Sequence, residues 1–77
     1  MPKKVFIFSE SGESAIRAED IVSVWVERNP REMYNVLARV KEGNSFDDVY
    51  LVSLVSKKEA LRSLREITEE IEEILGG

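Results

Sequence analysis

The chain has 77 residues, with 11 basic and 15 acidic side chains, and it contains no cysteine and no histidine. This composition excludes disulfides, thiolate nucleophiles and zinc fingers, and it removes the commonest general base and metal ligand. A chain of 77 residues allows a single domain, residues 1–77, and such a fold buries only about 60% of the surface that its unfolded chain exposes. A deep active-site cleft between two domains is therefore excluded.

The first strand is expected at residues 5–8, a β-branched and aromatic run followed by a polar turn. Residues 1–4 resemble the charged start of a signal peptide, but the apolar run stops after four residues, where about 7 to 15 are needed. No segment approaches the roughly 20 apolar residues of a membrane span. We therefore expect a cytoplasmic protein with no membrane partner. The absence of glutamine and the many Glu, Lys and Arg residues favour a thermophilic source.

After a short stretch at residues 14–17, a strand is expected over residues 21–27, because apolar side chains alternate there with a period of two. The alternation predicts two faces, Val22, Val24 and Val26 on one, and Ile21, Ser23 and Trp25 on the other. Asn29 and Pro30 end this strand, because the residue before a proline avoids helical angles and the Asn-Pro pair favours a turn.

Residues 33–42 match two periodic templates. A strand would place Tyr34, Val36, Ala38 and Val40 on one face, whereas a helix would align Met33, Val36, Leu37 and Val40. The helix would also have Asn29 as its N-cap, Pro30 at its first position and Gly43 as its stop. Periodicity alone leaves both alternatives open.

Two further elements complete the chain. Residues 48–55 predict a strand rich in Val, Leu and Tyr, and the long connection at residues 42–47 departs from a tight hairpin. A helix is expected over residues 57–75, because Ser56 and Glu59 form a capping box and Gly76 ends the pattern. Its apolar stripe is wide enough to cover a sheet and consists of Ala60, Leu64, Ile67, Ile71 and Ile74, broadened by Leu61 and Leu75.

The order of residues 15–24, 34–38, 50–52 and 56–61 resembles a broad group of small, mostly uncharacterised bacterial and phage proteins. These are strand meanders closed by a C-terminal helix that begins Ser-Lys-x-Glu-Ala. The resemblance spans residues 15–75, favours a strand at residues 33–41 and implies no functional residues. We therefore expect an α+β fold, an antiparallel β-meander of four to five short strands packed on one C-terminal amphipathic helix. The alternative is a βαβα-like fold with residues 30–42 helical.

Motifs for chemistry are weak. Residues 9–14 follow a strand as phosphate-binding loops do, but they contain one glycine and two glutamates, which would repel phosphate. Ser14 has no histidine to activate it as a nucleophile. The ridge of Glu66, Glu70 and Glu73 offers oxygen atoms to a hard cation, but nothing in the sequence completes a coordination shell, so a solvated acidic face is the preferred explanation. We expect no catalytic residue, no cofactor and no metal site, and a protein that is not an enzyme.

Two features indicate self-association. Both faces of the predicted sheet are apolar and one helix can cover only one, so the other is closed either by curvature around Trp25 or by a second subunit. The last helix carries its basic residues in its first half and its acidic residues in its second. Local pairs, Arg62 with Glu66 and Arg65 with Glu69, account for this arrangement; two helices antiparallel across a two-fold axis are the alternative.

We therefore expect a small, non-catalytic protein-interaction or structural module that forms a homodimer. Its predicted interface is drawn from Ile21, Trp25, Arg62, Arg65, Glu70 and Glu73. The alternative is a nucleic-acid-associated module with a segregated basic surface, built from Lys3, Lys4, Arg17, Arg28, Arg31, Arg39, Lys41, Lys57 and Lys58, with Trp25, Tyr34 or Tyr50 as stacking platforms. The net charge of −4 argues against nucleic acid, since phosphate neutralisation dominates that affinity.

Overall fold

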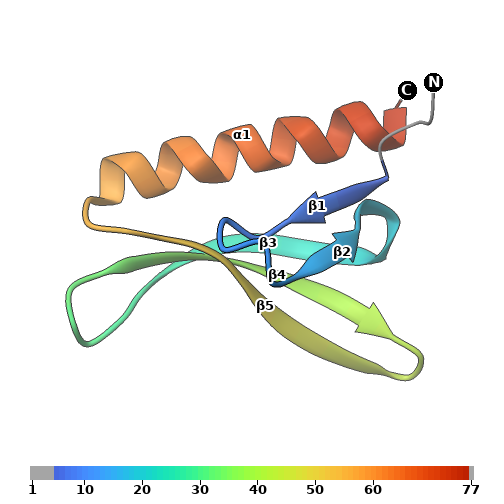
Figure 1. Ribbon diagram of the computed structural model, residues 1–77, viewed down its shortest axis with the longest axis horizontal. Helices are drawn as coiled ribbons and strands as arrows, with labels where there is room; N and C mark the ends of the chain where they lie inside the picture. The colour runs from blue at the N-terminus through green and yellow to red at the C-terminus, as the bar shows by residue number, and fades with distance from the viewer. Residues whose placement is uncertain (1–4, 77) are drawn as a thin grey trace.

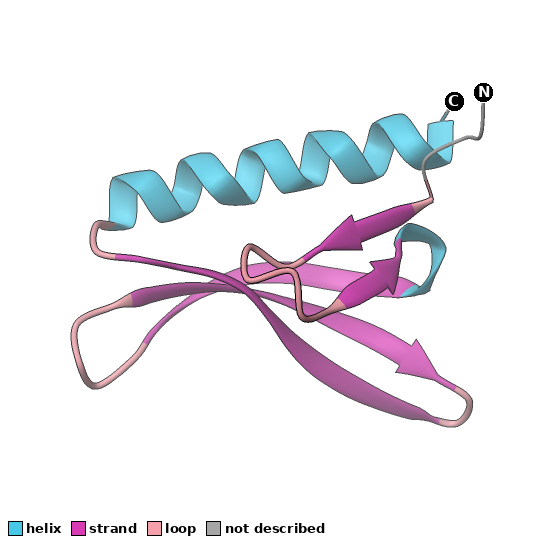
Figure 2. Ribbon diagram, viewed as in Figure 1, coloured by secondary structure: helices cyan, strands magenta, loops and turns pink. Residues whose placement is uncertain are grey.

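The computed structural model describes residues 5–76, which form two antiparallel sheets and one long helix (Figures 1 and 2). The smaller sheet is a hairpin of β1 (Phe6–Phe8) and β2 (Ala15–Arg17), followed by the 3-10 turn η1 (Ala18–Asp20). The larger sheet has the order β3-β4-β5, with bounds Ile21–Arg28, Tyr34–Glu42 and Ser45–Leu54. Helix α1 (Lys57–Gly76) packs on one face of the larger sheet. The predicted α+β class is confirmed.

The core lies between α1, the hairpin and the larger sheet. Its buried side chains come from the hairpin, from η1 and from the larger sheet: Ile7, Ile16, Ala18, Ala38, Val40 and Leu51. Ile67, Ile71 and Ile74 of α1 pack against them, which confirms that part of the predicted stripe. The hairpin is joined to the sheet by a backbone hydrogen bond of 2.8 Å from Glu10 N to the Leu51 carbonyl. The hairpin thus fills the space beside α1 on the β5 side.

Helix α1 begins where the capping box predicted. The backbone N–H of Glu59 donates a hydrogen bond of 3.1 Å to Ser56 Oγ, which satisfies one of the four N–H groups that a helix start leaves open. Ala60 is fully buried beneath the first turn. Leu61 and Leu75, however, are 47% and 57% exposed, so they do not broaden the covered stripe as expected.

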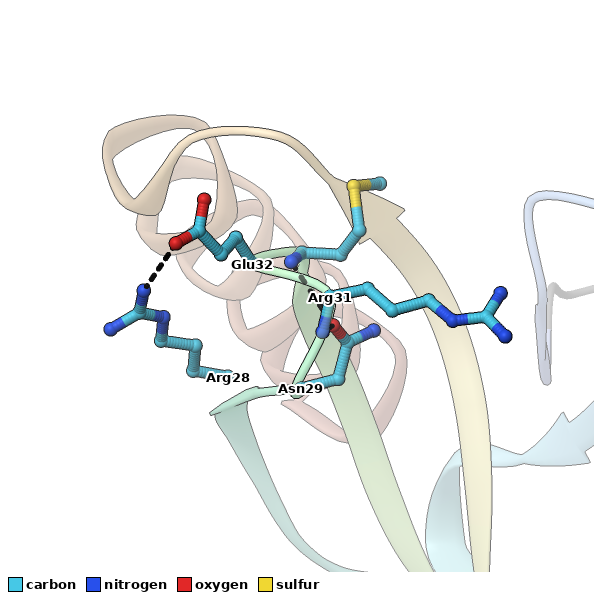
Figure 3. A network of polar contacts seen from close by, with 5 residues as sticks. Arg28, Asn29, Arg31 and Glu32 are labelled. Carbon is cyan, nitrogen blue, oxygen red and sulfur yellow. Dashed lines mark hydrogen bonds and ion pairs between the residues drawn. The ribbon is translucent and has the colours of Figure 1, made fainter.

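The segment that matched both templates is strand β4, so the βαβα-like alternative does not form. Figure 3 shows why Asn29 does not start a helix. Its Oδ1 accepts hydrogen bonds from the backbone N–H groups of Arg31 (2.9 Å) and Met33 (3.1 Å), and Glu32 adopts a left-handed φ of 61°. The side-chain oxygen that would cap a helix closes a turn instead, because the chain reverses at Glu32.

The connection between β4 and β5 is tighter than the sequence indicated. Glu42 pairs directly with Ser45, so Gly43 and Asn44 alone form the turn, and the expected long connection is wrong. Gly43 has a φ of 60°, a value that type II′ hairpin turns require at their first central position and that glycine adopts without strain. The strand therefore begins at Ser45 rather than at residue 48.

A β-bulge near the start of β3 corrects the predicted faces of that strand. Ile21 pairs with Val40 and Ser23 pairs with Arg39, so the register shifts at Val22. Since Val40 and Arg39 are neighbours on β4, Ile21 and Ser23 point to opposite faces. Ile21 packs against the core, and the prediction that it shares a face with Trp25 is wrong.

Candidate interaction surface

The face of the larger sheet that α1 leaves uncovered, here called the outer face, carries a row of three apolar side chains. Trp25 pairs with Leu37 across β3 and β4, and Leu37 pairs with Tyr50 across β4 and β5. Leu37 is only 3% exposed although no helix covers it. Trp25 is half-buried and Tyr50 is 58% exposed. Leu37, the central residue of this row, is therefore shielded from solvent by side chains of its own chain.

Arg39 secures this arrangement. Its guanidinium carbon lies 5.4 Å from the centre of the Trp25 ring, and its Nε donates a 3.0 Å hydrogen bond to Asp48 Oδ1. The hydrogen bond and the charge of Asp48 both raise the pKa of Arg39 above its usual value. The Arg39 guanidinium, which would otherwise attract a phosphate, is thus paired with the Asp48 carboxylate and lies over the Trp25 ring.

The two edges of the larger sheet differ in protection. Strand β5 carries Asp47 and Asp48, has a register shift beside Leu51, and meets the hairpin through the hydrogen bond from Glu10. Charges, bulges and covering segments are the usual means of blocking an edge strand. Strand β3 pairs only with β4 within residues 5–76, and its middle, Val24, Trp25 and Val26, has no charged residue. This stretch, the β3 edge, is the less protected one.

A groove of about 550 Å³ runs between β3 and α1. Val24 and Val26 line it from the strand, and Leu61 and Leu64 line it from the helix. Arg28, Tyr34 and Lys57 also line this β3–α1 groove, at the end of the molecule where the β3–β4 turn lies close to the start of α1. The groove was not predicted from the sequence, where Leu61, at the margin of the helical stripe, was the one residue that could have indicated it.

The side of α1 next to β3, here called the α1 flank, is hollowed and carries Leu61, Leu64, Arg65, Thr68, Glu69 and Glu72. It is basic and apolar toward the start of the helix and acidic toward its end. Among residues 5–76, the ion pairs join Arg17 to Glu19, Arg28 to Glu32 and Arg39 to Asp48. Arg62 and Arg65 thus form no ion pair with the glutamates one turn along, and the local pairing considered above is not seen.

The predicted interface residues do not lie on one surface. Ile21 is partly buried and packs against the core, whereas Trp25 reaches both the outer face and the β3–α1 groove. Arg65 lies on the α1 flank. Arg62 and Glu73 are exposed. Glu70 lies about 140° around the helix from Arg65, as five residues at 3.6 per turn require.

The predicted basic surface is similarly divided. Arg17, Arg28 and Arg39 each have an acidic partner, and Lys3 and Lys4 lie outside the described residues. The loop at residues 9–14 is a compact turn in which Ser9 Oγ accepts a 3.1 Å hydrogen bond from the backbone N–H of Ser14. In the part of the chain that the structure describes, no three acidic side chains gather closely enough to hold a metal ion.

Comparisons with protein-family models, curated proteins and solved structures give no match for this chain. The resemblance to bacterial and phage strand-meander proteins therefore stays a prediction from the sequence. Within residues 5–76, no helix combines the length and apolar character that crossing a membrane requires.

Proposed function

We propose that this protein is a small, non-catalytic interaction module that self-associates as a homodimer through the β3 edge. The observation that carries the proposal is the open side of β3 at Val24 to Val26, which faces away from β4 and pairs with no other strand of residues 5–76, beside the apolar β3–α1 groove. Unpaired backbone groups at an edge strand form a template for another strand, and charged residues normally block it. Here the charged residues of β3, Glu27 and Arg28, stand only at its end.

A second copy of the chain supplies a matching strand. Antiparallel pairing of two β3 edges about a two-fold axis uses the same edge of each subunit, so the assembly closes at two copies. The resulting sheet would have six strands, with both α1 helices on one face. A stable interface of standard size buries about 800 Å² per partner, or roughly one-seventh of the 5697 Å² that this chain exposes. The whole of β3, with 8 residues, is about 26 Å long, and the whole of α1, with 20 residues, is about 30 Å long.

Light scattering over a concentration series tests self-association. We expect a mass of twice the chain at tens of micromolar protein, falling toward the monomer on dilution. A monomer at all concentrations up to hundreds of micromolar would overturn the proposal. Because the same series reports larger species, an open aggregate that grows without limit would also contradict a closed dimer.

Nucleic-acid association is the second candidate, and the exposed rings of Tyr50 and Phe46 on the outer face favour it. The pairing of Arg39 with Asp48 weighs against it, as does the net charge of −4. Titration of single-stranded DNA while the Trp25 emission is followed separates the two candidates. Saturable quenching that weakens steeply with salt would support nucleic-acid binding; unchanged emission would leave the self-association proposal as the better one.

A further inference from the structure

We infer that the dimer is centred on Trp25: the two-fold axis passes between the two copies of Trp25, and Val24 of each subunit pairs with Val26 of the partner subunit. This inference rests on the proposed homodimer and adds the register of its strand pairing. It follows from three features of one chain: the direction of the backbone groups of β3, the bulge at Val22, and the position of the β3–α1 groove.

The hydrogen bonds between β3 and β4 fix which backbone groups of β3 point to its open side. The N–H of Asn29 donates a 2.9 Å hydrogen bond to the carbonyl of Met33, one pair beyond Arg28 opposite Tyr34. In an antiparallel ladder, opposite pairs alternate between exchanging hydrogen bonds and not exchanging them. The register is unbroken from Arg28 back to Ser23, so this alternation continues through the regular part of β3.

Trp25, four residues before Asn29, therefore directs its backbone groups toward β4. The N–H and C=O groups of Val24 and Val26 point away from β4, to the open side of the strand. A symmetric pair of β3 strands must set outward-pointing groups opposite each other. An axis between two neighbouring residues would set an outward-pointing residue opposite an inward-pointing one, so the axis lies at a residue: Val24, Trp25 or Val26.

The bulge and the charged end of β3 select Trp25 among these three. An axis at Val24 would pair Val26 with Val22 of the partner subunit, where the bulge interrupts the strand. An axis at Val26 would set half-buried Trp25 opposite the charged side chain of Glu27 of the partner subunit. An axis at Trp25 sets indole opposite indole and valine opposite valine, and aromatic and β-branched cross-strand pairs stabilise a sheet.

The β3–α1 groove leaves room for the partner strand. Val24 and Val26 line it from the face of β3 that α1 covers, and Trp25 lines it from the outer face. A hollow that touches side chains from both faces of an edge strand lies along the open side of that strand. Its volume of about 550 Å³ therefore accommodates the valine side chains of the partner subunit beside Leu61 and Leu64.

Disulfide cross-linking of single-cysteine variants tests the register, because the chain itself contains no cysteine. Opposite residues that exchange no hydrogen bonds have Cα atoms about 4.5 Å apart, within the range of about 4.4 to 6.8 Å that a disulfide bridges. Trp25→Cys should therefore cross-link with its own copy under mild oxidation. Ser23→Cys mixed with Glu27→Cys should give a cross-linked heterodimer, since these two positions lie opposite each other in this register.

Ser23→Cys alone and Glu27→Cys alone are the matched controls. Each should stay free of cross-links, because its two cysteines lie roughly 13 Å apart along the paired strands. This pair of variants also leaves Trp25 intact, so the test holds even where Trp25→Cys disturbs the stack with Arg39. Non-reducing gel electrophoresis measures the cross-links, circular dichroism checks the fold of each variant, and sedimentation velocity measures the wild-type dimer in parallel.

The possible failures are distinguishable. If Trp25→Cys cross-links instead with Ser23→Cys or with Glu27→Cys, the axis lies at Val24 or at Val26, which overturns the register and leaves pairing through the β3 edge standing. A wild-type dimer in which none of these variants cross-links would overturn the register together with the β3 edge as the interface. A wild-type monomer would overturn the proposed self-association itself.

Discussion

Arg39 and Trp25 form a stacked pair on the outer face, with the guanidinium carbon 5.4 Å from the centre of the indole ring. The same guanidinium binds Asp48 through two nitrogens, at 3.0 and 3.4 Å. The three side chains come from three neighbouring strands, so they link β3, β4 and β5 across the face that α1 does not cover. This arrangement explains how half-buried Trp25 is shielded without a second subunit on the outer face.

The first prediction concerns this pair. Arg39→Gln should shift the fluorescence emission of Trp25 to longer wavelength, because the ring loses the side chain that covers it. The change in stability should be small, since exposed ion pairs contribute little. Asp48→Asn is the control, because it removes the charge of the partner and retains the arginine. An emission spectrum of Arg39→Gln identical to that of the wild type would contradict the stacked arrangement.

The second prediction concerns the turn between β3 and β4. Glu32 has a left-handed φ of 61°, which is strained for glutamate and which glycine adopts without strain. Glu32→Gly should therefore raise the free energy of unfolding by about 1 kcal/mol. Glu32→Gln removes the ion pair with Arg28 but keeps the strained backbone, so it should not stabilise the protein. Denaturant melts of both variants measure the difference, and equal stabilities would assign the effect to charge rather than to backbone strain.

The strand at β4 shows what the sequence could decide and what it could not. Tyr34, Val36, Ala38 and Val40 satisfy a period of two, yet the same segment also satisfies a helical period. Asparagine is common both as a helix N-cap and in turns, so its presence at position 29 favours neither alternative in the sequence; in the structure Asn29 Oδ1 accepts hydrogen bonds from the N–H groups two and four residues later. The pairing of β4 with a strand on each side decided the outcome, and such long-range pairing leaves no local signal.

The third prediction concerns the stripe of α1. Ile71 packs against the core, so Ile71→Ala should lower the free energy of unfolding by about 2 to 5 kcal/mol through lost burial and a cavity. Leu75→Ala is the matched control on the same helix. Leu75 is 57% exposed, and its truncation should be nearly neutral. Equal losses from the two truncations would mean that α1 is rotated relative to the sheet.

The fourth prediction concerns the start of α1. Ser56→Ala removes the acceptor of the Glu59 N–H hydrogen bond and should cost about 0.5 to 2 kcal/mol. Ser56→Asp keeps an acceptor oxygen at the same position and should retain most of the stability. Thermal melts compare the two variants. A loss in Ser56→Asp as large as that in Ser56→Ala would show that the hydroxyl does not act as the cap.

The surfaces were harder to predict than the elements. Strict alternation over residues 21–27 predicted that Ile21 and Trp25 lie on the same face of the sheet. The bulge at Val22 instead places the Ile21 side chain on the opposite face, where it packs against the core. A bulge adds one residue to one strand, so it changes the face without changing the apolar pattern. The charge asymmetry of α1 was visible in the sequence. Which side of α1 lies next to β3 could not be read from the sequence; the structure shows it, because Leu61 and Leu64 line the β3–α1 groove.

The most direct measurement for the central claim is the sedimentation velocity of Leu61→Glu beside Leu75→Glu. Both variants place a glutamate on an exposed leucine of the same helix, but only Leu61 lines the β3–α1 groove. We expect wild type and Leu75→Glu to sediment as dimers at tens of micromolar, and Leu61→Glu to sediment as a folded monomer, because the dimer would bury its new charges near the two-fold axis. A Leu61→Glu variant that still sediments as a dimer would contradict self-association through the β3 edge.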